Sequence, residues 1–389
     1  MTLSRRLSLV IGLTQLISWA TTYYVPAVVT GAASKSIGAS PTALLGAFSW
    51  ALLLTGLASP RVGRRIELLG GRGVLAAGNV VMAAGLGLMA AWPTLPGWYA
   101  GWTVAGLGMA LGLYDPAFAT IGRLLGPAAR PAIVGVTLFG GFASTVGWPL
   151  GVAFVGLLGW RGTLGAYAAI LIGLNVPLLL ALVPRAAGGP WSANAPETAE
   201  APPRGGLLMF VLLAAFFALR SGISAVVSVH ALRLFHGLGL GAAAAVGVAS
   251  LIGPMQVGGR LAEVAAGRRL DPLTTSWLGA ALLPLGVAAL LAGGPATVFA
   301  ITYGMSNGIL TISRGTLPMY LFGPRGYAVR IGQLALPVML TQAVTPTAIS
   351  PLVLAWPATS LFALLGIAAA LALACLLVVC RMGRSPRPV

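Results

Sequence analysis

Long apolar runs separated by short polar turns make up most of this chain. A helix needs about 20 mostly apolar residues to cross a bilayer. Twelve runs meet this requirement, at residues 8–32, 41–60, 73–92, 98–124, 131–158, 162–183, 206–232, 239–258, 272–292, 296–321, 329–355 and 357–380. Lipid cannot satisfy exposed backbone groups, and the alternating pattern of a membrane barrel is absent. We therefore expect an all-α membrane protein with twelve transmembrane helices.

The composition supports this interpretation. Only 7% of the residues are charged, whereas soluble proteins carry about 25%. The net charge of +17 does not indicate nucleic acid as a partner, because the arginines lie in short clusters between apolar runs. The chain has two histidines and two cysteines, and they form no cluster with metal-ligand spacing. We expect no metal and no cofactor.

The basic residues also predict an orientation. With the N-terminus in the cytoplasm, eighteen of the 23 basic residues fall in cytoplasmic segments, and only Lys35, Arg161 and Arg233 fall outside. Such a bias favours an even number of spans with both termini cytoplasmic, here in a bacterial inner membrane. His230 and His236 lie at or beyond the outer end of the seventh run, where we expect exposed or interfacial positions.

The longest polar stretch divides the chain into two halves. Residues 184–206 contain several prolines and glycines but no apolar run. We predict a six-helix bundle over residues 1–187, a flexible cytoplasmic linker over 188–204, and a second six-helix bundle over 205–389.

A repeated pattern relates these halves. Gly63-Arg64-x-x-Glu67-x-x-x-Gly71-Arg72 recurs as Gly259-Arg260-x-x-Glu263-x-x-x-Gly267-Arg268, at an offset of 196. Gly126-Pro127, Gly135 and Pro149 recur as Gly323-Pro324, Gly332 and Pro346, at an offset of 197. Parallel repeats of this kind are a known plan for transporters, with the substrate site at the interface of the halves. We predict two pseudo-symmetric bundles.

The polar part of the repeat falls in short loops between helices. Its glutamates can pair with nearby arginines and lie near the start of the following helix, where negative charge is favoured. One interpretation is a conformational latch, formed by Gly63, Arg64, Glu67, Arg72, Gly259, Arg260, Glu263 and Arg268. The alternative is that these residues only fix the topology and cap helices.

The segment from Gly63 to Arg72 resembles the signature loop of the major facilitator superfamily, with Glu67 in place of the usual aspartate and Leu68 in place of a basic residue. Gly106, Gly108, Gly112 and Pro116 resemble the glycine-spaced fourth helix of that family. Gly147-Trp148-Pro149-Leu150-Gly151 is similar to its fifth-helix antiporter signature. The resemblance implies the major facilitator fold, secondary transport, and a cavity lined by helices 1, 4, 7 and 10. A distant likeness to monocarboxylate porters accompanies it.

Three charged residues lie inside predicted spans, where charge is costly and a functional role is the default hypothesis. Asp115, Arg220 and Arg314 fall on the fourth, seventh and tenth runs, near one depth. The excess of arginine favours an anion, because a guanidinium stays charged and its fork fits carboxylates. The predicted substrate-binding residues are Arg220, Arg314, Asp115, Asn307, Tyr23, Tyr24, Trp19 and Gln15. Asp115 is also the candidate for carrying a proton; the alternative is a structural ion pair.

These observations predict a secondary transporter that moves a small organic anion by alternating access, with a proton in symport or antiport. One alternative is proton-driven efflux of drugs or other amphipathic compounds. Another is a membrane sensor or scaffold that has a transporter fold and shows no flux. ATP does not drive it directly, since no glycine-rich phosphate loop is present, and without a nucleophile–base pair it is not an enzyme. We expect a monomer whose partners are the substrate, protons and the bilayer.

Overall fold

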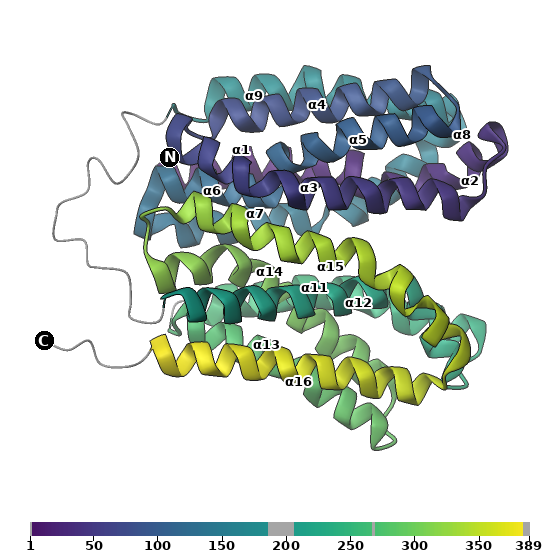
Figure 1. Cartoon of the computed structure of the whole chain (residues 1–389), viewed down its shortest axis with the longest axis vertical. Coiled ribbons are helices and arrows are strands. Elements are labelled where there is room, and N and C mark those ends of the chain that lie inside the picture. Colours follow the sequence, from purple (N-terminus) through teal and green to yellow (C-terminus); the bar gives the residue numbers. More distant parts are fainter. Residues whose placement is uncertain (1, 186–205, 267–268, 384–389) are drawn as a thin grey trace, which may run out of the picture. The chain divides into compact units, whose positions relative to one another are not determined.

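A computed structural model describes residues 2–185, 206–266 and 269–383 (Figure 1). Over these ranges the secondary structure is helical, without a strand. The first half contains α1 (Leu3–Ser18), the π-helix η1 (Trp19–Tyr23), α2 (Val25–Ile37), α3 (Pro41–Leu69), α4 (Arg72–Ala91), α5 (Leu95–Gly112), α6 (Tyr114–Leu125), the 3₁₀-helix η2 (Gly126–Ala129), α7 (Arg130–Gly141), α8 (Ala143–Ile170), the π-helix η3 (Leu171–Asn175) and α9 (Val176–Leu182). The second half contains α11 (Gly206–Gly237), α12 (Ala242–Ala266), α13 (Pro272–Leu291), α14 (Ala296–Phe322), α15 (Tyr327–Ala355) and α16 (Ala358–Gly383).

These helices account for the twelve predicted spans. Eight described helical stretches are long and apolar enough to cross a membrane; seven are single helices, and the eighth, Leu95–Leu182, comprises α5 to α9. The first, fourth, fifth and sixth spans consist of shorter pieces, and α8 contains a non-helical residue, Gly159, where the fifth span turns into the sixth. The span predicted at 41–60 is too short as a helix, because α3 continues to Leu69. Arg61, Arg64 and Arg65 mark the end of the apolar run, but the helix itself continues past them.

Capping side chains fix several helix starts. Ser40 and Thr94 accept hydrogen bonds from the backbone N–H groups of Ala43 and Gly97, at 3.2 Å each. Asp271 accepts two, from Leu273 and Thr274. Each cap satisfies N–H groups that have no partner in the first turn of a helix. Single polar residues therefore mark the starts of these helices, even in a chain that is mostly apolar.

The chain forms two compact units. The first contains residues 1–199 and 323–336, and the second contains residues 200–322 and 337–389. The first unit thus takes in Gly323–Leu336, which the sequence assigns to the C-terminal bundle. The predicted linker at 188–204 lies outside the described residues.

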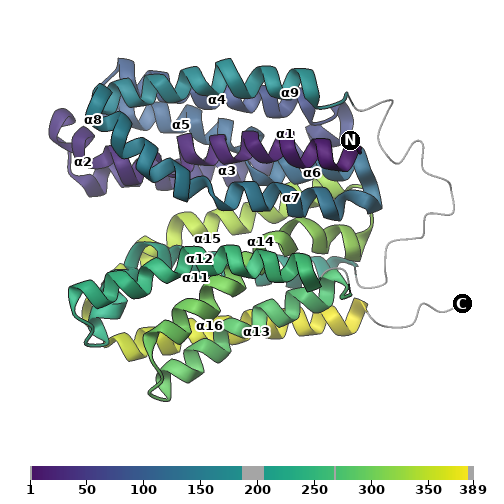
Figure 2. The same cartoon turned by 180° about the vertical axis from the view of Figure 1, so that it is seen from behind.

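Each unit is held together by closely packed helices. In the first, α4 packs on α5 and α3 packs on α5; in the second, α14 packs on α12 and α13, and α11 on α16 (Figures 1 and 2). Glycine allows the closest contacts: a Cβ at Gly78 would lie 2.7 Å from the backbone of α5, and one at Gly308 would lie 2.1 Å from the carbonyl of Gln256. Close packing of this kind supplies the attraction between helices that the hydrophobic effect cannot supply in lipid.

Candidate functional site

The first unit contains an aromatic cluster at an interruption of the first span. Trp19 and Tyr23 begin and end η1, and Tyr24 caps it. The ring of Trp19 lies 4.7 Å from that of Tyr23 and 4.8 Å from that of Tyr114. Tyr23 in turn contacts Phe48 at 5.3 Å. The structure thus brings together the predicted Trp19, Tyr23 and Tyr24, and adds Tyr114 and Phe48, which the sequence analysis missed.

The fourth span breaks at Leu113, between α5 and α6. Pro116 has no N–H group, so the carbonyl of Gly112, four residues earlier, loses its helical partner. The side chain of Gln15 replaces that partner, because its Nε2 donates to the Gly112 oxygen at 2.7 Å. Gln15 is buried, and its Oε1 has no hydrogen-bond partner in the described structure. Its predicted contact with substrate remains a prediction, but it also has this structural role.

A second polar group, absent from the predicted set, lies beside Gln15. Asn175 Nδ2 approaches three acceptors: the carbonyl of Thr14 at 3.1 Å, Ser18 Oγ at 3.0 Å and Asn79 Oδ1 at 2.8 Å. All four residues are buried. Polar side chains that connect helices in this way are a common source of stability in membranes. The polar cluster joins α1, α4 and η3 and sets the position of the first span.

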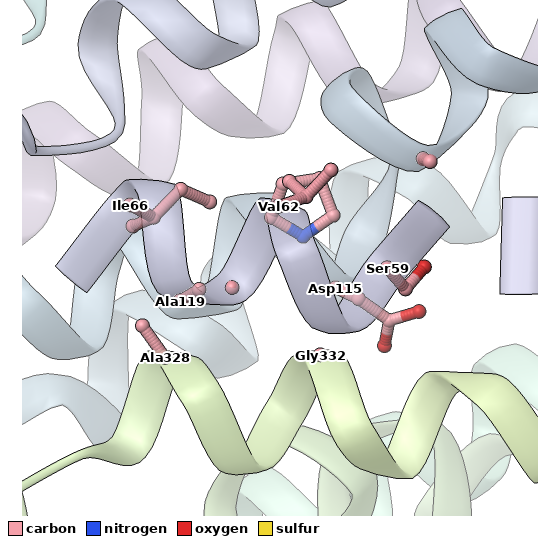
Figure 3. A pocket seen from close by; sticks show the side chains of 10 residues that line it. Ser59, Val62, Ile66, Asp115, Ala119, Ala328 and Gly332 are labelled. Atoms are coloured by element: carbon pink, nitrogen blue, oxygen red, sulfur yellow. The ribbon is translucent and has the colours of Figure 1, made fainter. Parts of the chain in front are cut away.

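Asp115 lies in the first turn of α6, where the helix dipole favours negative charge. It is 7% exposed, and its carboxyl group lies beside Ser59 of α3 and Gly332 of α15 (Figure 3). These residues line a cavity of about 10 Å³, which has room for about one water molecule. Asp115 also interacts electrostatically with Tyr327. The predicted proton carrier is therefore a buried carboxyl group within the first unit.

In the second unit, Arg220 of α11 is buried, with 6% of its surface exposed. Its Nη2 donates to Ser306 Oγ at 3.0 Å, and Ser306 donates onward to the carbonyl of Gly279 at 2.6 Å. Its Nε and Nη1 have no hydrogen-bond partner in the described structure. The phenol of Tyr303, which donates to Ser224 at 3.2 Å, interacts electrostatically with it.

Arg314 and Asn307 lie half-buried on α14. Ser306 and Arg314 are eight residues apart, which is about 12 Å along a helix. Asp115 belongs to the first unit, whereas Arg220 and Arg314 belong to the second. A common site for all three charges therefore stays a prediction. Tyr303 and Ser306 were missed, although they are neighbours of the predicted Asn307 along α14.

The first copy of the repeated loop packs on the start of α15, within the first unit. A Cβ at Gly63 would lie 2.4 Å from the Ala328 carbonyl, and one at Gly332 would lie 2.4 Å from the Ser59 carbonyl. The backbone N–H of Ala328 donates to Glu67. Glu67 also interacts electrostatically with Arg123 and Arg330. Arg64 is exposed and Arg72 half-buried.

The second copy has different neighbours. A Cβ at Gly259 would lie 2.3 Å from the Met305 carbonyl of α14. Arg260 and Glu263 are buried, and Glu263 accepts a long hydrogen bond of 3.4 Å from Thr275. Arg268 lies outside the described residues. The two copies thus have different neighbours, and the conformational latch stays a prediction for both.

Over residues 2–185, 206–266 and 269–383, no group of three His, Cys, Asp or Glu side chains could hold a metal ion. The geometry instead provides a buried guanidinium, a buried carboxyl group and a cluster of aromatic rings. Groups of these kinds are the ones that bind and orient small solutes in protein pockets.

Comparison with known proteins gives the family. Residues 9–346 match the model of the Major Facilitator Superfamily. The structure is similar to that of the human organic anion transporter MFSD10 (TETRAN), with a TM-score of 0.76, 15% identity, and coverage of 97% of this chain and 100% of that one. It is also similar to the proton:xylose symporter XylE (TM-score 0.72, 16% identity, 95% and 94% covered) and to FucP in its outward conformation (TM-score 0.73, 12% identity, 97% and 98% covered).

A search of curated protein sequences finds no significant match. At these identities the structural matches show the fold alone, and they confirm the predicted all-α fold of twelve helices in two bundles. The likeness to monocarboxylate porters stays a prediction. Members of the matched family are transporters of small molecules rather than enzymes. The chain belongs to the Major Facilitator Superfamily and is a multi-pass membrane protein that acts as a secondary transporter.

Proposed function

We propose that this transporter carries a small organic anion by alternating access, and that Arg220 binds its negatively charged group. The observation behind the proposal is the incomplete pairing of a buried guanidinium. One of its three nitrogens donates to Ser306, the other two have no hydrogen-bond partner in the described structure, and no described carboxylate pairs with it. A buried charge is costly unless it is paired, and a carboxylate substrate supplies both the charge and the missing acceptors.

Arg314 and Asn307 extend the proposed site along α14. The Tyr303, Asn307 and Arg314 positions fall on one helical face, since they are spaced by four and seven residues. An anion bound at Arg220 would meet the Tyr303 phenol first, with Arg314 about 12 Å away along the helix. This spacing favours a small substrate with one strong anchor over a substrate that must span both arginines.

Asp115 is the proposed proton-coupling residue. It is a buried carboxyl group beside a cavity with room for about one water molecule, and burial disfavours its charged form. We place the protein in a bacterial inner membrane with both termini in the cytoplasm, because of the arginine distribution. We further propose that Glu67 and Gly63 latch α3 to the start of α15 in one transport state.

Efflux of amphipathic compounds is the second candidate function. Its support is the aromatic cluster around η1, where the ring of Trp19 lies within 5 Å of the rings of both Tyr23 and Tyr114. Aromatic faces attract organic cations and apolar rings. In this case Asp115, rather than Arg220, would be the residue whose loss abolishes transport.

The test is proton and solute flux in liposomes loaded with a pH-sensitive dye. Small organic anions, inorganic oxyanions and amphipathic cations are added in turn to the wild type and to Arg220→Gln, Arg220→Lys and Asp115→Asn. Arg5→Gln, an exposed position with the same change in charge, is the control. We expect Arg220→Gln to lower anion flux about 30-fold, because a hydrogen-bonded charge contributes about 2 kcal/mol.

Arg220→Lys should keep part of the anion flux, since it preserves the charge but loses the fork. A response to cations alone, lost in Asp115→Asn and kept in Arg220→Gln, would reject the anion proposal in favour of efflux. Binding without flux for every class of compound would indicate the sensor or scaffold.

A further inference from the structure

The three basic residues expected on the outer side of the membrane have different surroundings. Arg161 Nε donates to the Ala90 carbonyl at 2.7 Å and so caps the end of α4. Lys35 lies in the last turn of α2, where the helix dipole favours a positive charge. Arg233 is exposed near the end of α11, and within the described ranges it makes no hydrogen bond or ion pair. Its charge has no explanation in the structure of the chain itself.

Arg233 lines a cleft of about 370 Å³ within the second unit, at the ends of α11, α15 and α16. The base of the cleft is apolar and buried, with Leu234 at 1%, Val353 at 5% and Leu361 at 3% exposure. The rim carries Arg233, His236 and the exposed ring of Trp356. No acidic residue lines it, so the cleft combines a positive rim with an apolar floor.

The length of α11 places the cleft at the expected edge of a bilayer. α11 has 32 residues and is therefore about 48 Å long, whereas the hydrocarbon core is about 30 Å thick. We therefore expect its last two turns, which include Arg233 and His236, at the level of lipid headgroups. Tryptophan is enriched at the membrane–water interface, and Trp356 lines this cleft.

His236 adds a polar group suited to an uncharged hydroxyl. Its Nδ1 lies 3.0 Å from the Leu240 carbonyl, and because a carbonyl only accepts, Nδ1 carries the hydrogen. In the neutral ring Nε2 is then an acceptor, able to bind a hydroxyl group. A guanidinium and a hydrogen-bond acceptor on one rim fit a phosphate that bears a hydroxylated headgroup.

We propose that this cleft binds an anionic phospholipid with a hydroxylated headgroup, such as phosphatidylglycerol. Arg233 pairs with the phosphate, His236 accepts from a headgroup hydroxyl, and an acyl chain lies on Leu234, Val353 and Leu361. The complementarity of charge, the apolar floor and the level of the cleft in the bilayer together identify a lipid rather than a soluble anion. The site is separate from Arg220 and does not depend on the substrate proposed above.

The experiment is a lipid titration of the purified full chain in a neutral detergent, followed by thermal unfolding and by native mass spectrometry. The probes are phosphatidylglycerol, phosphatidylethanolamine, inorganic phosphate and glycerol 3-phosphate. The variants are Arg233→Gln, Arg233→Lys, Trp356→Ala and the control Lys35→Gln, which removes the same charge from another position expected outside.

We expect phosphatidylglycerol to bind and stabilise the wild type more than phosphatidylethanolamine does. Arg233→Gln should weaken this binding roughly fivefold, Arg233→Lys should restore most of it, and Lys35→Gln should leave it unchanged. Equal stabilisation by phosphatidylethanolamine, or by inorganic phosphate or glycerol 3-phosphate without acyl chains, would overturn the proposal. So would an equal loss in Lys35→Gln. If Arg233→Gln does not fold, the Arg233→Lys and Trp356→Ala titrations decide the question.

Discussion

The two units carry their predicted site residues on helices of different kinds. In the first unit, the first span is interrupted by η1 and the fourth span breaks at Leu113. In the second unit, the corresponding helices α11 and α14 are continuous, although α14 contains Pro318. The interrupted helices present aromatic rings and a carboxyl group, whereas the continuous ones present arginines. In the first unit, the aromatic rings and the carboxyl group therefore lie where a helix is interrupted and backbone groups lose their helical partners. In the second unit, the arginines lie on helices without such breaks.

The largest expected effect is on thermal stability, and it distinguishes Gly112 from Gly308, two glycines related by the offset of 196. A Cβ at Gly308 would meet the Gln256 backbone carbonyl at 2.1 Å, whereas one at Gly112 would meet the flexible end of Met82 at 2.7 Å. Overpacking against backbone costs about 3 kcal/mol, because the neighbour cannot move aside. We expect Gly308→Ala to lower the midpoint of thermal unfolding by several degrees, and Gly112→Ala to lower it much less.

Gly253→Ala, in the same unit with nothing within 4 Å, is the matched control and should have no such cost. Equal losses in Gly308→Ala and Gly112→Ala would mean that the interrupted helix is as tightly packed as the continuous one.

Much of this fold follows from sequence, but the interruptions do not. Apolar length predicts the spans, and Pro116 predicts a kink in the fourth. The two π-helices are less obvious. Each is followed by a proline, Pro26 or Pro177, and the carbonyl four residues before that proline falls inside the π-helix. Proline is not sufficient, because Pro254 and Pro284 lie in unbroken helices.

The candidate site was only partly predictable for a similar reason. Charge in an apolar run singles out Asp115, Arg220 and Arg314. Ser306 and Tyr303, the neighbours of Arg220, are ordinary polar residues in a helix. Only packing between helices shows which of them face Arg220, and sequence spacing within one helix cannot supply that information.

The second prediction tests whether the hydrogen bond from Gln15 to the Gly112 carbonyl compensates for the backbone hydrogen bond that Pro116 removes from the fourth span. Gln15→Leu removes the donor to the Gly112 carbonyl and leaves it buried without a partner, at a cost of about 2 kcal/mol. Pro116→Ala restores a backbone N–H that can bond to the same carbonyl. The two substitutions should therefore be coupled by about 1 kcal/mol in a double-mutant cycle of thermal or denaturant unfolding. Additive effects would show that Gln15 does not compensate for Pro116.

The smallest expected effect is on the accessibility of the start of α15, and it should differ between the two copies of the repeated loop. Glu67 contacts the start of α15 through the Ala328 N–H, whereas Glu263 contacts Thr275. Loss of one such interaction shifts an equilibrium by about 1 kcal/mol. In a background with Cys375→Ala and Cys380→Ala, we expect Glu67→Gln to raise maleimide labelling of Ala328→Cys about fivefold. Glu263→Gln serves as the matched substitution and should leave labelling unchanged; the same increase in both would argue against a latch specific to the first copy.

The π-helix in the first span also affects how the halves should be aligned. A π-turn contains one residue more than an α-turn, so side chains before and after η1 differ by about 100° from their positions on a plain helical wheel. Since α11 has no such turn, the equivalence of the first and seventh spans changes by one residue across it. Tyr24 corresponds to Arg220 at an offset of 196, but Gln15 corresponds to Leu212 at an offset of 197. An alignment that forbids gaps within membrane spans would therefore compare the wrong residues along half of this helix.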